Sequence, residues 1–190
     1  MAIVLLISPQ ELKDQTPVNG NVDEKLLKEP ILYCQDNYVQ NLVGTGIYNE
    51  IKAQVTAGTL TVLNTTLLND YIQPALKHWV MMESIRSLSY RYMNIGVVKK
   101  DSPNARPISE SEIQTLENNH KNKAQWYAQQ AQKYLCENDT DYPLYGNPGD
   151  GIDVIPPQPN QYNTSLFLGG KRGKGRTKIK CRGWDGYYRN

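Results

Sequence analysis

Apolar side chains recur along this chain at spacings of three and four residues, which is the period of an amphipathic helix. The first such stripe steps by four, three, four and four residues, through Leu27, Ile31, Cys34, Tyr38 and Leu42. Pro30 lies inside the stripe and predicts a kink or a fresh helix start, because proline cannot donate a helical hydrogen bond. Gly44 and Gly46 predict the end of this helix, and a shorter helix is expected over 47–56.

Two longer helices are predicted further along. Residues 66–92 are apolar around so much of the helical circumference, Trp79 included, that we expect a central helix, bent near its start by Pro74. Ser109 and Glu112 form a capping box, in which each side chain accepts a backbone N–H at a helix start. The predicted helix runs from there to 137–138. Its expected apolar face consists of Ile113, Leu116, His120, Ala124, Tyr127, Ala131 and Tyr134.

The first residues of the chain favour a short strand, because they are aliphatic or β-branched and are followed by the turn residues Ser8 and Pro9. These residues are Ile3, Val4, Leu5, Leu6 and Ile7. A lone strand leaves its backbone groups unpaired, so it must pair within the subunit or with the edge of a neighbour. The second alternative makes these five residues a candidate inter-subunit strand.

The chain changes character after the last predicted helix. Proline and glycine make up eight of the 20 residues in 141–160, which is incompatible with a packed helix or a central strand. The predicted fold class is therefore mainly α: a small helical bundle with a short N-terminal strand, an extended Pro/Gly-rich arm and a basic C-terminal tail. We expect a helical domain over 1–140, the arm over 141–170 and the tail over 171–190.

Charge is distributed unevenly along the sequence. The tail carries eight basic residues and one acidic residue, whereas residues 1–170 carry 13 basic and 18 acidic residues. The candidate contact residues of the tail are Lys171, Arg172, Lys174, Arg176, Lys178, Lys180, Arg182, Trp184, Tyr187 and Tyr188. Cations interleaved with glycine and followed by aromatic rings suit the phosphates and bases of nucleic acid. They equally suit an acidic protein surface on which the tail becomes ordered, and a merely solvated end is the third alternative.

Candidate catalytic chemistry is not visible in the sequence. The chain has two histidines, His78 and His120, and the second lies on an apolar helix stripe, where a core or interface role is expected. The cysteines are far apart, and no HExxH or Cys/His pattern supplies a metal-ligand set. The glycine-rich stretch 169–175 lacks the spacing of a phosphate-binding loop. We therefore expect no enzymatic activity, no metal and no cofactor.

Two further features concern partners. The apolar run at residues 2–7 is too short to span a membrane, so no membrane association is expected. Tyrosine outnumbers phenylalanine by 13 to one. Tyrosine suits a surface that is wet before assembly and buried after it, although a biased genome would give the same composition. The composition favours a protein with a large subunit interface.

The start of the chain resembles that of the helical head-tail connector proteins, or adaptors, of tailed bacteriophages. The resemblance lies in the stretch from Ser8 to Lys13, the stretch from Asp23 to Leu27, and 31–44, followed by a second long helix containing 73–80. It covers about residues 3–95. Tyr33 or Cys34 stands where the family pattern has alanine. The long arm and the basic tail depart from the compact pattern and resemble the extended connectors of larger phages, such as crAss-like phages.

The resemblance implies a virion structural protein at the head-tail junction, made in the cytoplasm of the bacterial host. Such a protein forms a ring, typically a dodecamer, that binds the portal protein, joins it to tail proteins and surrounds the DNA channel. A repeated head-to-tail contact between copies closes such a ring. The alternative is a small nucleic-acid-binding protein that uses the basic tail.

Overall fold

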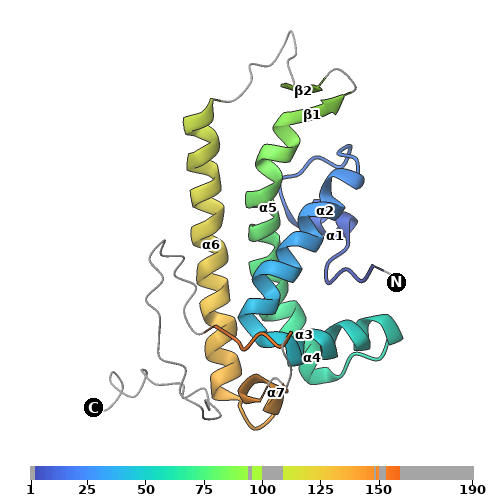
Figure 1. Cartoon of the computed structure of the whole chain (residues 1–190), viewed down its shortest axis with the longest axis vertical. Coiled ribbons are helices and arrows are strands. Elements are labelled where there is room, and N and C mark those ends of the chain that lie inside the picture. Colours follow the sequence, from blue (N-terminus) through green and yellow to red (C-terminus); the bar gives the residue numbers. More distant parts are fainter. Residues whose placement is uncertain (1–2, 94–95, 100–108, 148, 150–152, 159–190) are drawn as a thin grey trace, which may run out of the picture.

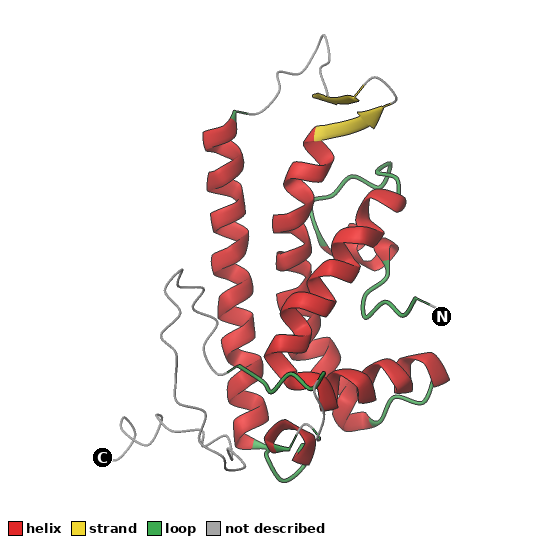
Figure 2. Cartoon of the chain, in the orientation of Figure 1, coloured by secondary structure: helices red, strands yellow, loops and turns green. Residues whose placement is uncertain are grey.

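The computed structural model describes residues 3–93, 96–99, 109–147, 149 and 153–158. These residues form a mainly helical bundle, which confirms the predicted fold class (Figures 1 and 2). The basic tail predicted over 171–190 lies outside the described residues.

The helices and strands follow one another along the chain without a long irregular connection in the first half. The α-helices are α1 (Pro9–Gln15), α2 (Lys25–Cys34), α3 (Gln40–Ala57), α4 (Val62–Thr66), α5 (Gln73–Ser89), α6 (Glu110–Glu137) and α7 (Pro143–Gly146). Two π-helical turns, η1 (Gln35–Val39) and η2 (Leu67–Ile72), join α2 to α3 and α4 to α5. The strands are β1 (Tyr90–Met93) and β2 (Gly96–Lys99).

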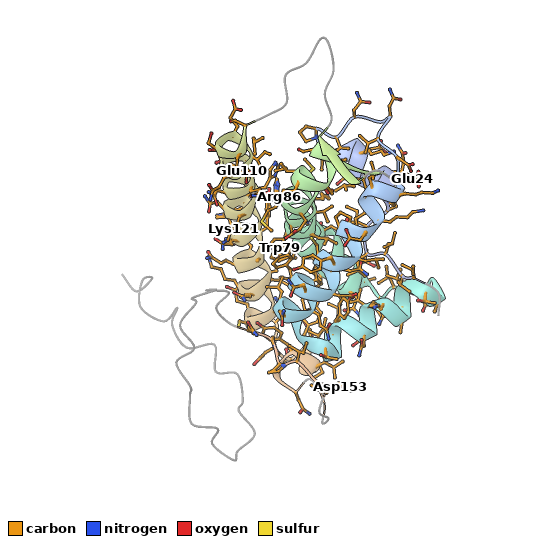
Figure 3. All side chains as sticks on the ribbon, turned by 45° about the horizontal axis from the view of Figure 1, so that its top comes forward. Glu24, Trp79, Arg86, Glu110, Lys121 and Asp153 are labelled. Carbon is orange, nitrogen blue, oxygen red and sulfur yellow. The ribbon has the colours of Figure 1, made fainter. Side chains whose placement is uncertain are left out.

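The long helices α5 and α6 form an antiparallel pair, with α2 packed on the other side of α5 (Figure 1). Consequently α5 is the central helix that its broad apolar pattern predicts. Trp79 of α5 is 2% exposed and lies in the middle of the core (Figure 3). Tyr38 of η1 stacks on Trp79 with ring centroids 5.2 Å apart. Burying side chains of this size contributes about 2–3 kcal/mol each to folding.

Helix boundaries follow the capping residues closely. Ser109 accepts a hydrogen bond from the Glu112 amide, and the Glu112 carboxylate accepts one from the Ser109 amide at 2.9 Å, so the predicted capping box is present. Gly58, with φ of 66°, ends α3 in the left-handed conformation that glycine adopts without steric cost. Both helix ends were predicted from the sequence.

Pro74 lies directly after a π turn, whereas Pro30 lies inside α2, five residues before the π turn η1 begins. The amide of Gln73 bonds to the carbonyl of Leu68, five residues earlier, immediately before Pro74. The amide of Gln40 bonds to Gln35 with the same spacing, ten residues after Pro30. Each π turn inserts one extra residue into the helical ladder and shifts the register of the following helix. The stripe of apolar positions that contains Pro30 therefore stays buried across α2, η1 and α3.

Three predicted features need correction. The central helix ends at Ser89 rather than at 92, and β1 then pairs antiparallel with β2. Leu116, predicted on the apolar face of α6, is 41% exposed, whereas Ile113 and Ala124 are buried. The proline-rich region contains a one-turn helix, α7, because Pro143 occupies its first turn and Tyr145 is buried against the bundle.

Candidate functional site

The N-terminal segment, residues 3–8, lies on the bundle without forming a strand, so the strand predicted for 3–7 is wrong. The amide group of Gln35, completely buried, accepts a hydrogen bond from the Leu6 N–H at 3.1 Å and donates one to the Val4 carbonyl at 2.8 Å. The Gln73 amide donates to the Leu6 carbonyl at 3.0 Å. Two glutamine side chains thus take the place of a neighbouring strand.

Because the N-terminal segment binds to its own subunit, residues 4–7 are not free to pair as a strand with a neighbouring subunit. Leu6 and Ile7 are buried in the core of their own subunit. Releasing the segment to a neighbour would expose both side chains and leave the buried Gln35 amide without partners, at a cost of about 1–3 kcal/mol per unpaired group. Ile3, 71% exposed, remains available for a contact between subunits.

The arm also docks on its own subunit, at a break in α3. Gly44 has φ of 82° and ψ of 159°, outside the helical region, which interrupts the helix where the sequence predicts an end. In a continuous helix the Thr45 amide would bond to the Asn41 carbonyl. Instead the Thr45 amide bonds to the Ile155 carbonyl at 3.0 Å, and the Asn41 carbonyl accepts from the Gln158 amide at 2.9 Å.

The arm segment, residues 153–158, therefore binds where one helical hydrogen bond of α3 is missing. It supplies a partner for both groups of that bond, the Thr45 amide and the Asn41 carbonyl. The Ile155 amide adds a bond to the Thr45 hydroxyl at 2.8 Å, and Gln132 of α6 donates to the Gln158 carbonyl at 2.8 Å. Pro157 is buried against Gly44. This segment crosses from α6 to α3 in Figure 1, so the described part of the predicted arm packs on its own bundle.

Exposed apolar side chains lie on α2, α4 and α6, and those on α4 are Val62 and Leu63, which are 83% and 43% exposed. On α2, Leu26 is 40% exposed and Tyr33 is 47% exposed. On α6, Leu116 and Trp126 are 41% and 56% exposed. The helix α5 lies between α2 and α6 (Figures 1 and 2). The exposed faces of α2 and α6 are available for contacts with other molecules.

Ion pairs join α5 to the first half of α6. Arg86 pairs with Glu110 at 2.9 Å and with Glu117 at 2.6 Å, as Figure 3 shows for the first pair. The hydrogen bonds to Glu117 and Glu110 raise the pKa of Arg86 above its usual value. Half of the Arg86 side chain is exposed, so solvent screens these pairs and their role is to orient the helices rather than to stabilise them strongly.

The two histidines lie side by side between α5 and α6, in the core-or-interface setting that was expected. Their Nδ1 atoms are 3.3 Å apart, and Tyr127 stacks on the His78 ring with centroids 5.7 Å apart. Burial, followed by the positive charges of His120, Lys123 and Lys77, lowers the pKa of His78 to about 4. Burial and Lys123 lower the pKa of His120 as well.

Buried nucleophilic groups are held in their protonated forms. Burial, together with the charges of Glu83 and Glu29, raises the pKa of the Cys34 thiol far above its usual value. Burial and Glu83 raise the pKa of Tyr38, whose hydroxyl donates to Glu83 at 3.1 Å. A protonated thiol is a poor nucleophile, so Cys34 behaves as a small apolar core residue.

The candidate contact residues of the tail, from Lys171 to Tyr188, lie outside the described residues. Within the part of the chain that the structure describes, no group of three or more His, Cys, Asp or Glu side chains could hold a metal ion. None of the described helices combines the length and apolar character needed to cross a membrane. The docked N-terminal and arm segments were not predicted, because their partners are 26 to 117 residues away along the chain.

The geometry defines a helical bundle with two segments docked on its surface and exposed apolar side chains on α2, α4 and α6. Residues 39–153 match a protein family described as "Family of unknown function (DUF6712)", and the chain belongs to this family. The match starts at the end of η1 and includes α3, α5, α6 and α7. Comparisons with curated proteins and with solved structures found no match.

Proposed function

We propose that this protein is a virion structural subunit that forms a ring at the portal vertex, joins the capsid portal to the tail and surrounds the DNA channel. The resemblance to phage head-tail connectors over about residues 3–95 supports this proposal. The helical bundle and the apolar pattern from α2 to α5 agree with that resemblance.

The observation that carries the proposal is the pair of unlike apolar faces on α2 and α6. A ring closes when one surface of a subunit binds a different surface of the next copy and the rotation returns to its start. Tyr33 and Leu26 on α2, and Trp126 and Leu116 on α6, provide exposed apolar side chains on the two helices that flank α5. Aromatic residues are enriched at the centre of such interfaces.

The two docked segments support a subunit that is complete before it assembles. Because Gln35, Gln73 and the break at Gly44 hold both segments on their own bundle, the ring does not need exchanged strands. A portal ring can then act as the template on which separate subunits gather.

The experiment is native mass spectrometry of the purified protein mixed with the portal ring of the same phage. A portal mass increased by a fixed multiple of 21.6 kDa is expected, and the multiple gives the symmetry. Trp126→Ser should weaken ring formation at least about tenfold, as expected for a central interface aromatic. Asn122→Ser, an exposed change one turn earlier on α6, is the matched control and should assemble normally.

The rival function, nucleic-acid binding by the tail, is measured on the same sample. Deleting residues 171–190 should leave a folded bundle with weaker docking to the portal. Binding to single-stranded DNA that falls steeply with salt and disappears with this deletion, together with no added portal mass, would favour the rival and contradict the ring proposal.

A further inference from the structure

A groove beside the histidine pair has a composition that neither ring formation nor the tail explains. It lies between α5, α6 and the end of α1, and it is lined by Gln15, Thr16, Lys77, His78, His120 and Tyr127 among others. The Lys77 ammonium donates to the Gln15 side-chain oxygen, so one wall of the groove is fixed by a hydrogen bond between α5 and α1.

The groove is rich in groups that can carry positive charge. Lys77 and both histidines line it, and Lys123, one turn after His120 on α6, acts on both imidazoles. No aspartate or glutamate is among the described residues that line the groove. Nearby cations without a carboxylate partner create a positive potential that attracts an anion.

The histidine pair is suited to take up one proton when an anion arrives. With Nδ1 atoms 3.3 Å apart, a neutral pair shares one N–H···N hydrogen bond, so one ring donates and the other accepts. Adding a single proton at an Nε2 atom keeps that bond and leaves both Nε2 atoms as N–H donors. A second proton would put two N–H groups face to face and break the pair.

We propose that this groove binds a small oxyanion, held by Lys77, Lys123 and the singly protonated His78–His120 pair. Phosphate and carboxylate groups share the required chemistry: negative charge and several acceptor oxygens. A bound anion offsets the repulsion between the histidines and the lysines, so binding and proton uptake favour each other. Affinity therefore increases as the pH falls from 8 to 6.

A metal ion is the competing occupant, because Nδ1 atoms at this separation could both ligate one zinc ion at about 2.0–2.1 Å. The surrounding charge argues against it. Lys77 and Lys123 repel a cation, and the described lining of the groove supplies no carboxylate or thiolate as a third ligand.

The test uses the full chain, whose two histidines give only two imidazole Cε1–H signals by NMR. Inorganic phosphate and, separately, acetate are titrated to about 0.1 M at a constant ionic strength, which keeps general screening unchanged. We expect saturable shifts of both signals with phosphate. Sulfate, which stays a dianion between pH 8 and pH 6 whereas phosphate takes up a proton, should bind with an affinity about tenfold higher at pH 6 than at pH 8. Saturation by acetate as well would assign the groove to carboxylates and phosphates alike.

Matched lysine variants complete the test. Lys123→Met and Lys77→Met should each weaken phosphate binding about three- to tenfold. Lys121→Met removes the same charge from an exposed position on the same helix, labelled in Figure 3, and should change binding less than twofold. Unshifted histidine signals, equal loss in Lys121→Met, or 1:1 zinc binding that His78→Gln abolishes would overturn the proposal.

Discussion

The N-terminal segment and the arm segment are docked on the same bundle by different chemistry. Residues 3–8 are bound by two glutamine side chains, whose amides imitate the edge of a strand. Residues 153–158 are bound mainly by backbone groups that the break at Gly44 releases from α3. The first dock depends on which side chains are present, and the second depends on one backbone conformation. Substitutions should therefore separate the two docks cleanly.

Gly44→Ala should have the largest effect. Its φ of 82° is unfavourable for alanine, and an added Cβ would lie 2.8 Å from the Cδ atom of Pro157. We expect a loss of about 3 kcal/mol in the free energy of unfolding, measured by urea denaturation, with undocking of the arm. Gly58→Ala is the control, because its φ is also positive but its Cβ would meet open space, and it should cost about 1 kcal/mol. Equal costs would contradict the close contact with Pro157.

Gln35→Leu should have the next largest effect on stability, because it removes both hydrogen bonds between Gln35 and the N-terminal segment. The Leu6 amide is then left buried without a partner, and we expect a loss of about 2 kcal/mol. Limited proteolysis should detect release of residues 3–8 while the arm stays docked. Gln10→Leu changes an exposed glutamine on α1 and should be close to neutral. Release of the arm by Gln35→Leu would show that the docks are coupled.

Thr45→Val should have a smaller effect, centred on the arm. It keeps the shape of the side chain but removes the hydroxyl that accepts from the Ile155 amide and from the Gln40 side chain. We expect a loss of about 1 kcal/mol and faster hydrogen exchange at Ile155. Thr45→Ser restores the hydroxyl and should recover most of the protection, and failure to do so would assign the effect to packing of the methyl group.

Lowering the pH from 7 to 5 should have the smallest effect on the free energy of unfolding. It should weaken neither the docking of residues 3–8 nor that of residues 153–158 in particular. Glutamine, threonine and backbone groups hold both segments, and none of these titrates. The pKa of His78 is lowered to about 4 in the folded chain, so the unfolded chain binds the proton more readily. The contribution of neutral His78 to the free energy of unfolding is therefore complete above its ordinary pKa of 6.5 and is lost as the pH falls toward 4.

Because His78 is only partly buried, we expect a decrease of only about 1 kcal/mol between pH 7 and pH 5 in a phosphate-free buffer. His78→Gln should flatten this dependence, which thermal unfolding at several pH values measures. A dependence that persists in full in His78→Gln would assign it to His120 or to groups outside the histidine pair.

Local signals in the sequence predicted much of the bundle. The capping box at Ser109 and the terminal glycine at Gly58 mark helix ends, since both act within a few residues of their own position. The broad apolar surface of α5 predicted a central helix for the same reason. The docked segments were missed, because their partners come from distant parts of the chain. The aliphatic residues 3–7 favour a strand locally, but Gln35 and Gln73 supply the hydrogen bonds that a second strand would otherwise provide.

The proposed contact faces on α2 and α6 also depend on how distant parts of the chain pack together, which local sequence signals do not predict. A helical stripe predicts which positions share a side of α6, but Leu116 on that stripe is exposed although Ile113, three residues earlier, is buried. Exposure of Trp126 and Tyr33 depends on how three helices pack. The contact residues of the tail were proposed from charge alone, and their structure lies outside the described residues.

The central claim is that both segments belong to the folded subunit and that assembly uses the outer faces of α2 and α6. Hydrogen-deuterium exchange of the isolated protein and of its complex with the portal ring tests it most directly. We predict that the amides of Leu6, Thr45 and Gln158 are protected in the isolated protein and keep the same protection in the complex. Rapid exchange of these amides in the isolated protein, with protection gained only on assembly, would contradict the claim and indicate exchange of segments between subunits.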